Sequence, residues 1–347
     1  MTTPLVSILI VARNAAPFID AAILSACEQT LTDIEIVVVD DGSVDGTAQI
    51  VRAHVDRDPR VRLLEGPRKG LSAVRNASLN AARGRFAAIL DADDILHPRH
   101  LEWLVSSQAQ SGAEVCATNM VEFREEGVAF KTRAFAQGRR WRNTQVIQAA
   151  EFVSHGMIGG KSASLGYLKP LFDINFLRAH DMKYKERLRI GEDFDIVLRA
   201  LLAGARYLYL PQTTYYYRKH AGSISHRLAH ADLEELLLAT RAYPKAGEVL
   251  AAQLQARCDN LEGALLHLDV VAALKSRRLL HALWLTSTHR DARRLTLASL
   301  YEAVGKRIVQ AVARRKPART SALAHDESPV DRLRAIAQAV QPFVLSP

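Results

Sequence analysis

The chain has few cysteines and no long apolar run, although it is 347 residues long. Its three cysteines, Cys27, Cys116 and Cys258, lie far apart and form no CxxC pair. This excludes a disulfide framework and predicts reduced, structural thiols. No apolar segment reaches the roughly 18 residues of a membrane-spanning helix, and the N-terminus leads into a strand pattern rather than a signal peptide. We therefore expect a globular, cytosolic protein.

Three common ligand-binding motifs are also missing. No GxGxxG follows the first predicted strand, which argues against a Rossmann dinucleotide site. Residues 41–46 imitate an EF-hand loop, but Arg52 stands at the twelfth position, where a bidentate Glu belongs. Residues 156–162 are one residue short of a P-loop.

Positive charge is concentrated late in the chain. The formal net charge is +9, and residues 271–320 contain twelve lysines and arginines but two acidic residues. Such density suits nucleic acid, anionic lipid or phosphorylated substrates. Interleaved aromatic residues and a recognisable binding motif are missing there, which argues against nucleic acid.

Residues 5–120 alternate strand and helix patterns with short connections, which predicts an α/β fold with a mainly parallel sheet flanked by helices. The predicted strands are 6–12, 35–40, 61–65, 86–91 and 114–120. The predicted helices are 18–29, 47–55, 71–83 and 98–110. Gly84 and Gly112 stand where helix C-caps belong.

The pattern weakens over 121–160, where we expect a ribbon or a mobile loop, before a helix over 193–203 and a strand over 206–210. Beyond residue 225 the composition turns to Leu, Ala and Arg. It predicts helices over 231–255, 258–286 and 292–314, a linker over 314–320 and a last helix over 329–342.

An apolar strand runs directly into three carboxylates, Asp91, Asp93 and Asp94. Carboxylates this close raise each other's pKa unless a metal or a basic ligand neutralises them. They lie at the edge of the sheet where open α/β folds bind ligands. The alternative is a solvated acidic loop, with Asp94 or His97 near the cap of a helix that begins at Pro98.

Two earlier strands also end in polar residues, at Val11–Asn14 and at the adjacent Asp40 and Asp41. A capped turn explains the following residues 43–46 as well as a ligand does, but not the paired aspartates. Residues 69–76 place basic groups near a helix N-terminus, which suits a phosphate or an ordinary solvated face.

Two further groups of charges follow. Glu192 and Asp193 begin a predicted helix, either as capping residues or as a general base facing a cleft. Arg218, Lys219 and His220 come just after a strand. Three cations there suit a diphosphate or its metal; the alternative is solvated charge beside a core tyrosine.

Taken in order, six segments resemble the signature of family 2 inverting glycosyltransferases: VSILIVARN (6–14), VVDDGS (38–43), AVRN (73–76), DADD (91–94), GED (191–193) and YRKH (217–220). The resemblance covers about residues 5–225. It implies a GT-A type fold over 1–225, with a nucleotide-sugar-binding half over 1–120 and an acceptor half over 121–225. Residues 226–347 would then form a basic α-helical C-terminal region.

The resemblance also implies roles by position. Asp41 would hydrogen-bond a uracil-like base, and Asp193 would be the catalytic base, supported by Glu192. Asp93, Asp91 and His220 would hold Mg²⁺ or Mn²⁺, while Arg218 and His220 would bind the diphosphate. The nucleotide pocket would further include Val11, Ala12, Arg13, Asn14, Lys69, Arg75, Asp91 and Ala92. Many relatives have an aromatic residue where this chain has Arg13, so stacking on the base stays open.

The implied reaction moves a sugar from a nucleotide-diphosphate sugar, expected to be UDP-linked, to a saccharide hydroxyl with inversion, as in exopolysaccharide assembly. The basic C-terminal helices would contact the inner-membrane surface and meet a polyprenyl-diphosphate-linked acceptor; a helical lid or a dimer surface is the alternative. A nucleotidyltransferase or phosphohydrolase that also uses acidic metal ligands is the rival enzyme. A non-catalytic sugar-nucleotide sensor is the third hypothesis. The oligomeric state stays open.

Overall fold

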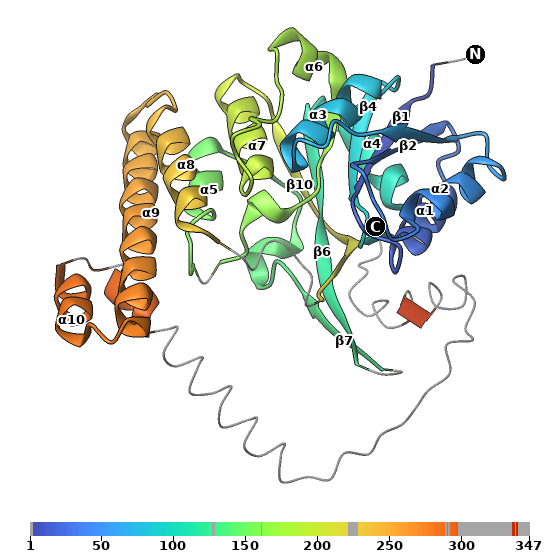
Figure 1. Ribbon diagram of the computed structural model, residues 1–347. Helices are drawn as coiled ribbons and strands as arrows, with labels where there is room; N and C mark the ends of the chain where they lie inside the picture. The colour runs from blue at the N-terminus through green and yellow to red at the C-terminus, as the bar shows by residue number, and fades with distance from the viewer. Residues whose placement is uncertain are drawn as a thin grey trace.

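A mixed sheet flanked by helices forms the centre of the protein (Figure 1). The computed structural model describes residues 3–126, 129–160, 162–220, 228–288, 290, 292–297, 335–336 and 338. Within them, ten strands form one sheet: β1 (Val6–Ala12), β2 (Ile34–Asp40), β3 (Val61–Glu65), β4 (Phe86–Asp91), β5 (Ile95–Leu96), β6 (Val115–Glu126), β7 (Ala129–Ala134), β8 (Gln145–Ile147), β9 (Leu171–Asp173) and β10 (Tyr207–Arg218).

Helices and two short 3-10 turns connect these strands. The α-helices are α1 (Ile19–Cys27), α2 (Thr47–Val55), α3 (Leu71–Ala81), α4 (His100–Ser111), α5 (Ala149–Ser154), α6 (Ile174–Ala179), α7 (Glu192–Leu202), α8 (His230–Arg241), α9 (Glu248–Lys275) and α10 (Leu279–Thr288). The 3-10 turns are η1 (Arg139–Arg142) and η2 (Leu165–Tyr167). None of the described helices is long and apolar enough to cross a membrane.

Strand direction brings four strand ends to one edge of the sheet. The strand order is β3-β2-β1-β4-β9-β6-β10-β5, and β1 to β4 are parallel. Strand β9 is antiparallel to both β4 and β6, and β6 is parallel to β10. Strands β4 and β10 therefore point the same way, and their carboxyl ends share an edge with those of β1 and β2. The predicted α/β fold with a mainly parallel sheet is confirmed.

The central strands are buried on both faces, which explains their uninterrupted apolar sequences. In β1 and β2 the runs from Ile8 to Ile10 and from Ile36 to Val39 are almost fully inaccessible to solvent. A buried parallel strand needs no polar face. Packing therefore does not explain the polar residues at its end.

Several predicted bounds agree with the structure to the residue: strands 6–12, 61–65 and 86–91, and helix 47–55. Gly112 is the C-cap of α4, with φ +66°. The predicted cap at Gly84 is wrong, because α3 ends at Ala81. Gly84 instead donates its N–H to Ser7 Oγ at 2.9 Å, and a Cβ there would lie 2.7 Å from the backbone nitrogen of Ser7.

The start predicted for the fourth helix is also wrong. Helix α4 begins at His100 rather than Pro98, with Arg99 at the cap position. Asp94 is buried and accepts hydrogen bonds from β10 instead of capping the helix. The acidic cluster therefore belongs to the carboxyl edge of the sheet and does not cap α4.

The C-terminal helices break at different places from those predicted. The chain turns between α8 and α9, where Pro244 lies and where Gly247 has φ +79°, so the predicted helix over 231–255 is two elements. Helix α9 then continues for 28 residues, and a second break at Arg277, with φ +57°, separates it from α10. The predicted helix over 292–314 is described only to residue 297. The linker and most of the last helix lie outside the described residues.

The region over 121–160 contains a ribbon, as predicted, because β7 pairs antiparallel with the long β6. The predicted strand over 206–210 continues to Arg218 through two register shifts. All three cysteines are free, and Cys116 and Cys258 are buried.

Candidate active site

Asp91 ends β4, and the structure surrounds its carboxylate with two cations. Arg75 Nη2 lies 3.0 Å from Asp91 Oδ1, and Lys169 Nζ lies 2.9 Å from Oδ2. Burial alone would raise the pKa of Asp91, but Lys169 and Arg75 outweigh it and lower this pKa to about 2. Asp91 is therefore ionised at every physiological pH.

The same two cations reach Asp193 in the first turn of α7. Lys169 Nζ lies 2.7 Å from Asp193 Oδ2, and Arg75 Nη2 lies 3.5 Å from that oxygen. Both cations are buried. Burial opposes their charge, but Asp193 and Asp91 raise the pKa of each well above its ordinary value. Residues from α3, the segment before β9, β4 and α7 thus meet in one charged group.

Glu192 is the third carboxylate of this group. Its Oε1 lies 3.6 Å from Arg75 Nε. Burial and the charge of Asp193 raise the pKa of Glu192 to about 7, against the opposing effect of Arg75 and Lys169. Gly191 makes the helix start possible: it has φ +79°, and a Cβ there would lie 2.6 Å from Leu236 of α8. We call Arg75, Asp91, Lys169, Glu192 and Asp193 the buried cluster.

Asp94 anchors the acidic segment to β10. Its carboxylate accepts hydrogen bonds from Tyr215 Oη at 2.8 Å and from the backbone N–H of Arg218 at 2.8 Å. Tyr215 Oη also accepts the N–H of Asp91 at 3.1 Å. Burial and the neighbouring Asp93 and Asp91 raise the pKa of Asp94 well above its ordinary value. Asp94 is thus part of the frame that positions the other two aspartates.

Asp93 and His220 form a separate, more open pair. His220 Nε2 lies 2.8 Å from Asp93 Oδ2, and both side chains are partly exposed. We call these two residues the open pair. Asp91, the third predicted metal ligand, is instead held by Lys169 and Arg75. Accordingly, no group of three or more His, Cys, Asp or Glu side chains within the described residues is arranged to hold a metal.

Arg218 is buried beside the open pair. Its Nε donates to the carbonyl oxygen of Asp93 at 2.8 Å, and its guanidinium forms an ion pair with Glu125. The rings of Phe18 and Phe123 lie 5.2 Å and 4.7 Å from its guanidinium carbon. Arg218 thus holds the acidic segment in place, and its predicted bond to a diphosphate stays a prediction.

The predicted base-binding residue, Asp41, is buried at the end of β2. Its Oδ1 accepts the N–H of Arg68 at 2.6 Å, which ties β2 to the segment after β3. Asn14, at the end of β1, donates its N–H to Ser43 Oγ at 2.8 Å and accepts the N–H of Val44 at 2.9 Å. The adjoining ends of β1 and β2 are thus joined by side-chain hydrogen bonds.

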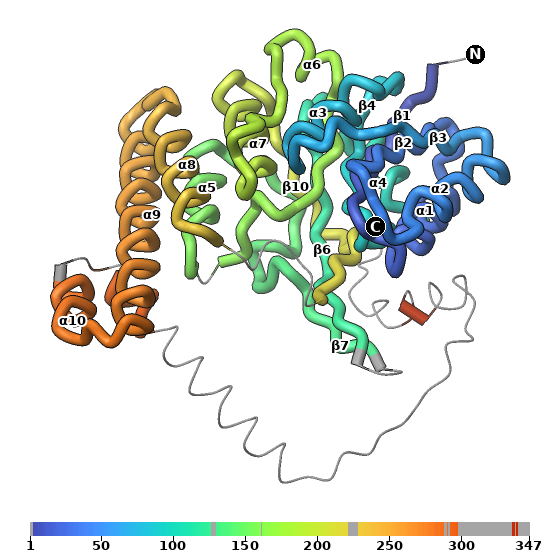
Figure 2. Tube along the Cα trace, in the orientation of Figure 1, coloured from blue at the N-terminus to red at the C-terminus, as the bar shows by residue number. Residues whose placement is uncertain are grey.

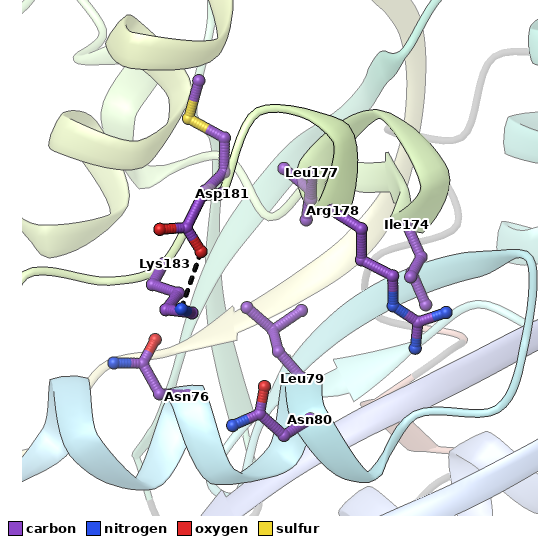
Figure 3. A pocket seen from close by; sticks show the side chains of 9 residues that line it. Asn76, Leu79, Asn80, Ile174, Leu177, Arg178, Asp181 and Lys183 are labelled. Carbon is purple, nitrogen blue, oxygen red and sulfur yellow. Dashed lines mark ion pairs between the residues drawn. The ribbon is translucent and has the colours of Figure 1, made fainter.

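The other predicted nucleotide-binding residues line the same edge. Arg13 and Lys69 are exposed, Val11 is half-buried, and Ala12 and Ala92 are buried. A cavity of about 140 Å³ lies between α3 and α6, toward the opposite edge of the sheet, where β9 ends beside Phe86, and is lined in part by Asn76, Asn80 and Lys183 (Figure 3). Substrate pockets usually measure about 300–1,000 Å³, so this cavity is too small for a nucleotide sugar.

Lys169 is the site residue that sequence reasoning missed. It follows η2 in an ordinary stretch, Tyr167-Leu-Lys-Pro170, and no motif marks it. Its two partners lie 78 positions before it and 24 positions after it. The signal was a lone lysine just before the short strand β9, which is too common a pattern to single out.

Comparison with known proteins identifies the family. Residues 7–165 match the model of glycosyl transferase family 2. The chain is 34% identical over 284 residues to the succinoglycan biosynthesis protein ExoO of Rhizobium meliloti, covering 81% of this chain and 80% of that protein. This chain belongs to glycosyl transferase family 2. It is also 30% identical over 229 residues to the putative glycosyltransferase EpsH of Bacillus subtilis, covering 65% and 64% of the two chains.

Solved structures agree with the GT-A type fold of this glycosyltransferase. The S. aureus TarS fragment 1-349 in complex with UDP-GlcNAc has a TM-score of 0.58 at 18% identity, covering 76% of this chain and 81% of that one. The mannosyltransferase PcManGT of Pyrobaculum calidifontis, in complex with GDP-Man and Mn²⁺, has a TM-score of 0.54 at 18% identity, covering 91% and 89%. The chain is thus a glycosyltransferase related to exopolysaccharide biosynthesis enzymes.

Proposed function

We propose that this glycosyltransferase moves a sugar from a UDP-sugar to a hydroxyl of a lipid-linked saccharide, with inversion at the anomeric carbon. The observation that carries the proposal is the buried cluster, which brings a strand-end aspartate and a helix-start carboxylate within reach of one lysine. TarS with UDP-GlcNAc and PcManGT with GDP-Man support a nucleotide-sugar donor. The exopolysaccharide relatives support a saccharide acceptor.

Donor binding is assigned to the sheet edge over residues 1–120. In this proposal Asp41 hydrogen-bonds the base, and Val11 to Asn14 line the nucleotide together with Lys69, Arg75, Asp91 and Ala92. Arg75 Nη1 supports the assignment, because within the described residues it is buried without a hydrogen-bond partner. A buried unpaired N–H is costly, and a donor oxygen would satisfy it.

Asp193 is proposed as the catalytic base of the acceptor half, residues 121–225. Its carboxylate takes the proton of an acceptor hydroxyl while that oxygen bonds to the anomeric carbon. The bond from this carbon to the diphosphate oxygen breaks, and its electron pair leaves with the nucleoside diphosphate. Lys169 and Arg75 orient the side chain of Asp193 through ion pairs, and Glu192, whose pKa is raised to about 7, supports it.

The open pair fits part of a metal site. One carboxylate oxygen and one imidazole nitrogen suit Mn²⁺, and Mg²⁺ is commonly completed by water and substrate phosphates. Asp93 and His220 would hold the ion, Asp91 would lie next to them, and Arg218 would bind the diphosphate. Bound there, Mg²⁺ or Mn²⁺ would supply positive charge to the leaving diphosphate.

A donor screen tests the proposal without knowledge of the acceptor. UDP-, GDP- and TDP-sugars are tested for thermal stabilisation of the protein with and without Mn²⁺, and stabilising donors are then tested for nucleotide release with saccharide acceptors. We expect stabilisation by one UDP-sugar that depends on Mn²⁺, followed by UDP release. Binding without release across the acceptors would favour the sugar-nucleotide sensor instead. Consumption of added inorganic diphosphate, with formation of a nucleoside triphosphate and a sugar 1-phosphate, would favour a nucleotidyltransferase.

A lipid-linked acceptor places the reaction at the cytoplasmic face of the inner membrane, with residues 226–347 nearest the lipid. Transfer to a polyprenyl-diphosphate-linked saccharide is compared with transfer to the same saccharide in free form. A preference for the lipid-linked form is expected. Equal rates would remove the lipid from the proposal and leave the sugar transfer unaffected.

A further inference from the structure

Helix α10 exposes an apolar face to solvent, on which the ring of Trp284 stacks against His281 of the same helix. The exposed residues are Leu279, Leu280, Leu283 and Trp284, and Leu280 and Trp284 are 85% and 61% accessible. At about 100° per residue, these four positions fall within roughly 140° of the helix circumference. The opposite face holds Ala282 and Leu285, which pack against Val270 and Ala273 of α9. The exposed face is therefore the outer side of a helix that is already anchored.

Basic residues precede and follow α10 in the sequence. Lys275, Arg277 and Arg278 precede it, Arg290, Arg293 and Arg294 follow it, and all six are exposed. Between residues 270 and 301 the sequence has one acidic residue, Asp291. None of the ion pairs among the described residues involves these six side chains, although Arg294 donates to the carbonyl oxygen of Gly159 at 2.9 Å. The apolar face is thus adjoined by three exposed cations at the turn that leads into α10, Lys275, Arg277 and Arg278.

We infer that α10 docks this glycosyltransferase on an anionic lipid surface. Apolar side chains would enter the boundary between headgroups and acyl chains, and Arg277 and Arg278 would lie at the level of the phosphates. Trp284 suits this position, because tryptophan has a large apolar ring and an N–H that seeks a polar partner. Helix α10 lies against the C-terminal end of α9, on the side away from the sheet, so docking leaves the sheet edge free (Figure 2).

A second copy of the chain suits this face less well. A helix of ten residues is about 15 Å long and about 10 Å wide, far smaller than the roughly 800 Å² that each partner contributes to a stable interface. Two copies would also bring two sets of arginines together. Anionic lipid, in contrast, is complementary to both the charge and the apolar character of the surface.

Tryptophan fluorescence of the full chain gives a direct test. The chain has three tryptophans, and Trp103 and Trp141 are buried while Trp284 is exposed. Addition of phosphatidylcholine vesicles containing phosphatidylglycerol should shift the emission to shorter wavelength, and Trp284→Phe should abolish the shift. Vesicles of phosphatidylcholine alone should give little binding, and added salt should weaken binding to the anionic vesicles.

Sedimentation with the same vesicles measures the affinity. Leu280→Ser/Leu283→Ser should weaken binding at least tenfold, and Arg277→Gln/Arg278→Gln about 25-fold, at roughly fivefold for each charge. The matched control is Leu238→Ser/Val249→Ser, which removes two exposed apolar residues from α8 and the start of α9 and should leave binding unchanged.

Three results would overturn the inference: no binding to the anionic vesicles, unchanged binding by the α10 variants, or a dimer in light scattering that Leu280→Ser/Leu283→Ser dissociates. The last would assign the face to a second copy. UDP release with a water-soluble acceptor should be the same in all these variants. The proposed docking surface and the proposed transfer reaction are therefore tested independently.

Discussion

The buried cluster and the open pair lie next to each other at the carboxyl edge of the sheet, but their carboxylates differ in their counter-charges and in their exposure to solvent. In the buried cluster, Lys169 and Arg75 neutralise Asp91 and Asp193 within the protein. In the open pair, the ion-pair partner of Asp93 is His220, and both side chains are partly exposed to solvent. The contrast indicates that buried cations neutralise the carboxylates of the first group, whereas the carboxylate of the second is partly open to solvent.

The largest effect should come from the proposed base. Asp193→Asn removes the proton acceptor while keeping the shape of the side chain, and we expect sugar transfer to fall by about 10²- to 10⁴-fold. Donor binding, measured by thermal stabilisation with UDP-sugar, should persist. Asp181→Asn, at an exposed aspartate, is the control. Unchanged transfer by Asp193→Asn would remove this residue from the mechanism.

Lys169→Met tests whether the buried cluster depends on its bridging cation. The variant leaves Asp91 and Asp193 short of a positive charge, so unfolding in urea should require roughly 3–5 kcal/mol less free energy. Transfer should fall about 10²-fold through misplacement of the base. Lys183→Met, at an exposed lysine, should change neither quantity.

Glu192→Gln tests the pH dependence of the buried cluster. The folded pKa of Glu192 is raised from 4.5 to about 7, so the folded state binds more protons than the unfolded state between these values. Its contribution to stability is therefore present at low pH and falls by roughly 3 kcal/mol as pH rises through 7. Urea unfolding at pH 5 and pH 8 should show this loss in the wild type and not in the glutamine variant. The exposed Glu186→Gln should behave like the wild type.

The open pair should give the smallest effect on stability and a selective effect on the metal response. Asp93→Asn breaks a partly exposed pair, so its unfolding free energy should change by less than about 1 kcal/mol. Thermal stabilisation by UDP-sugar should nevertheless lose its dependence on Mn²⁺. Asp56→Asn, at an exposed aspartate on another surface, controls for general charge effects. A metal response that survives in Asp93→Asn would place the ion elsewhere.

The fold was most predictable where local pattern and tertiary environment agree. Strands β1 and β4 and helix α2 begin and end where apolar runs meet polar residues, and their bounds agree with the prediction. The split between α8 and α9 was missed because Leu and Ala continue on both sides of it, and Pro244 and Gly247 alone mark the turn.

The site was predictable in its strand-end and helix-start residues but not in the contacts between them. Asp91 and Asp193 stand out because each breaks a local pattern at an element's end. The charge state of Asp91 depends on Lys169, which reaches it only because β9 is inserted between β4 and β6. The sequence around Lys169 does not show that this lysine is buried between two carboxylates that are far from it in the chain.

The stereochemistry of the first-formed product tests the account most directly. When water replaces the acceptor, the sugar released from an α-linked UDP-sugar is followed by proton NMR before its anomers equilibrate. Direct attack by a hydroxyl activated at Asp193 predicts the β anomer as the first product. The α anomer would require two successive displacements and would contradict the proposed mechanism.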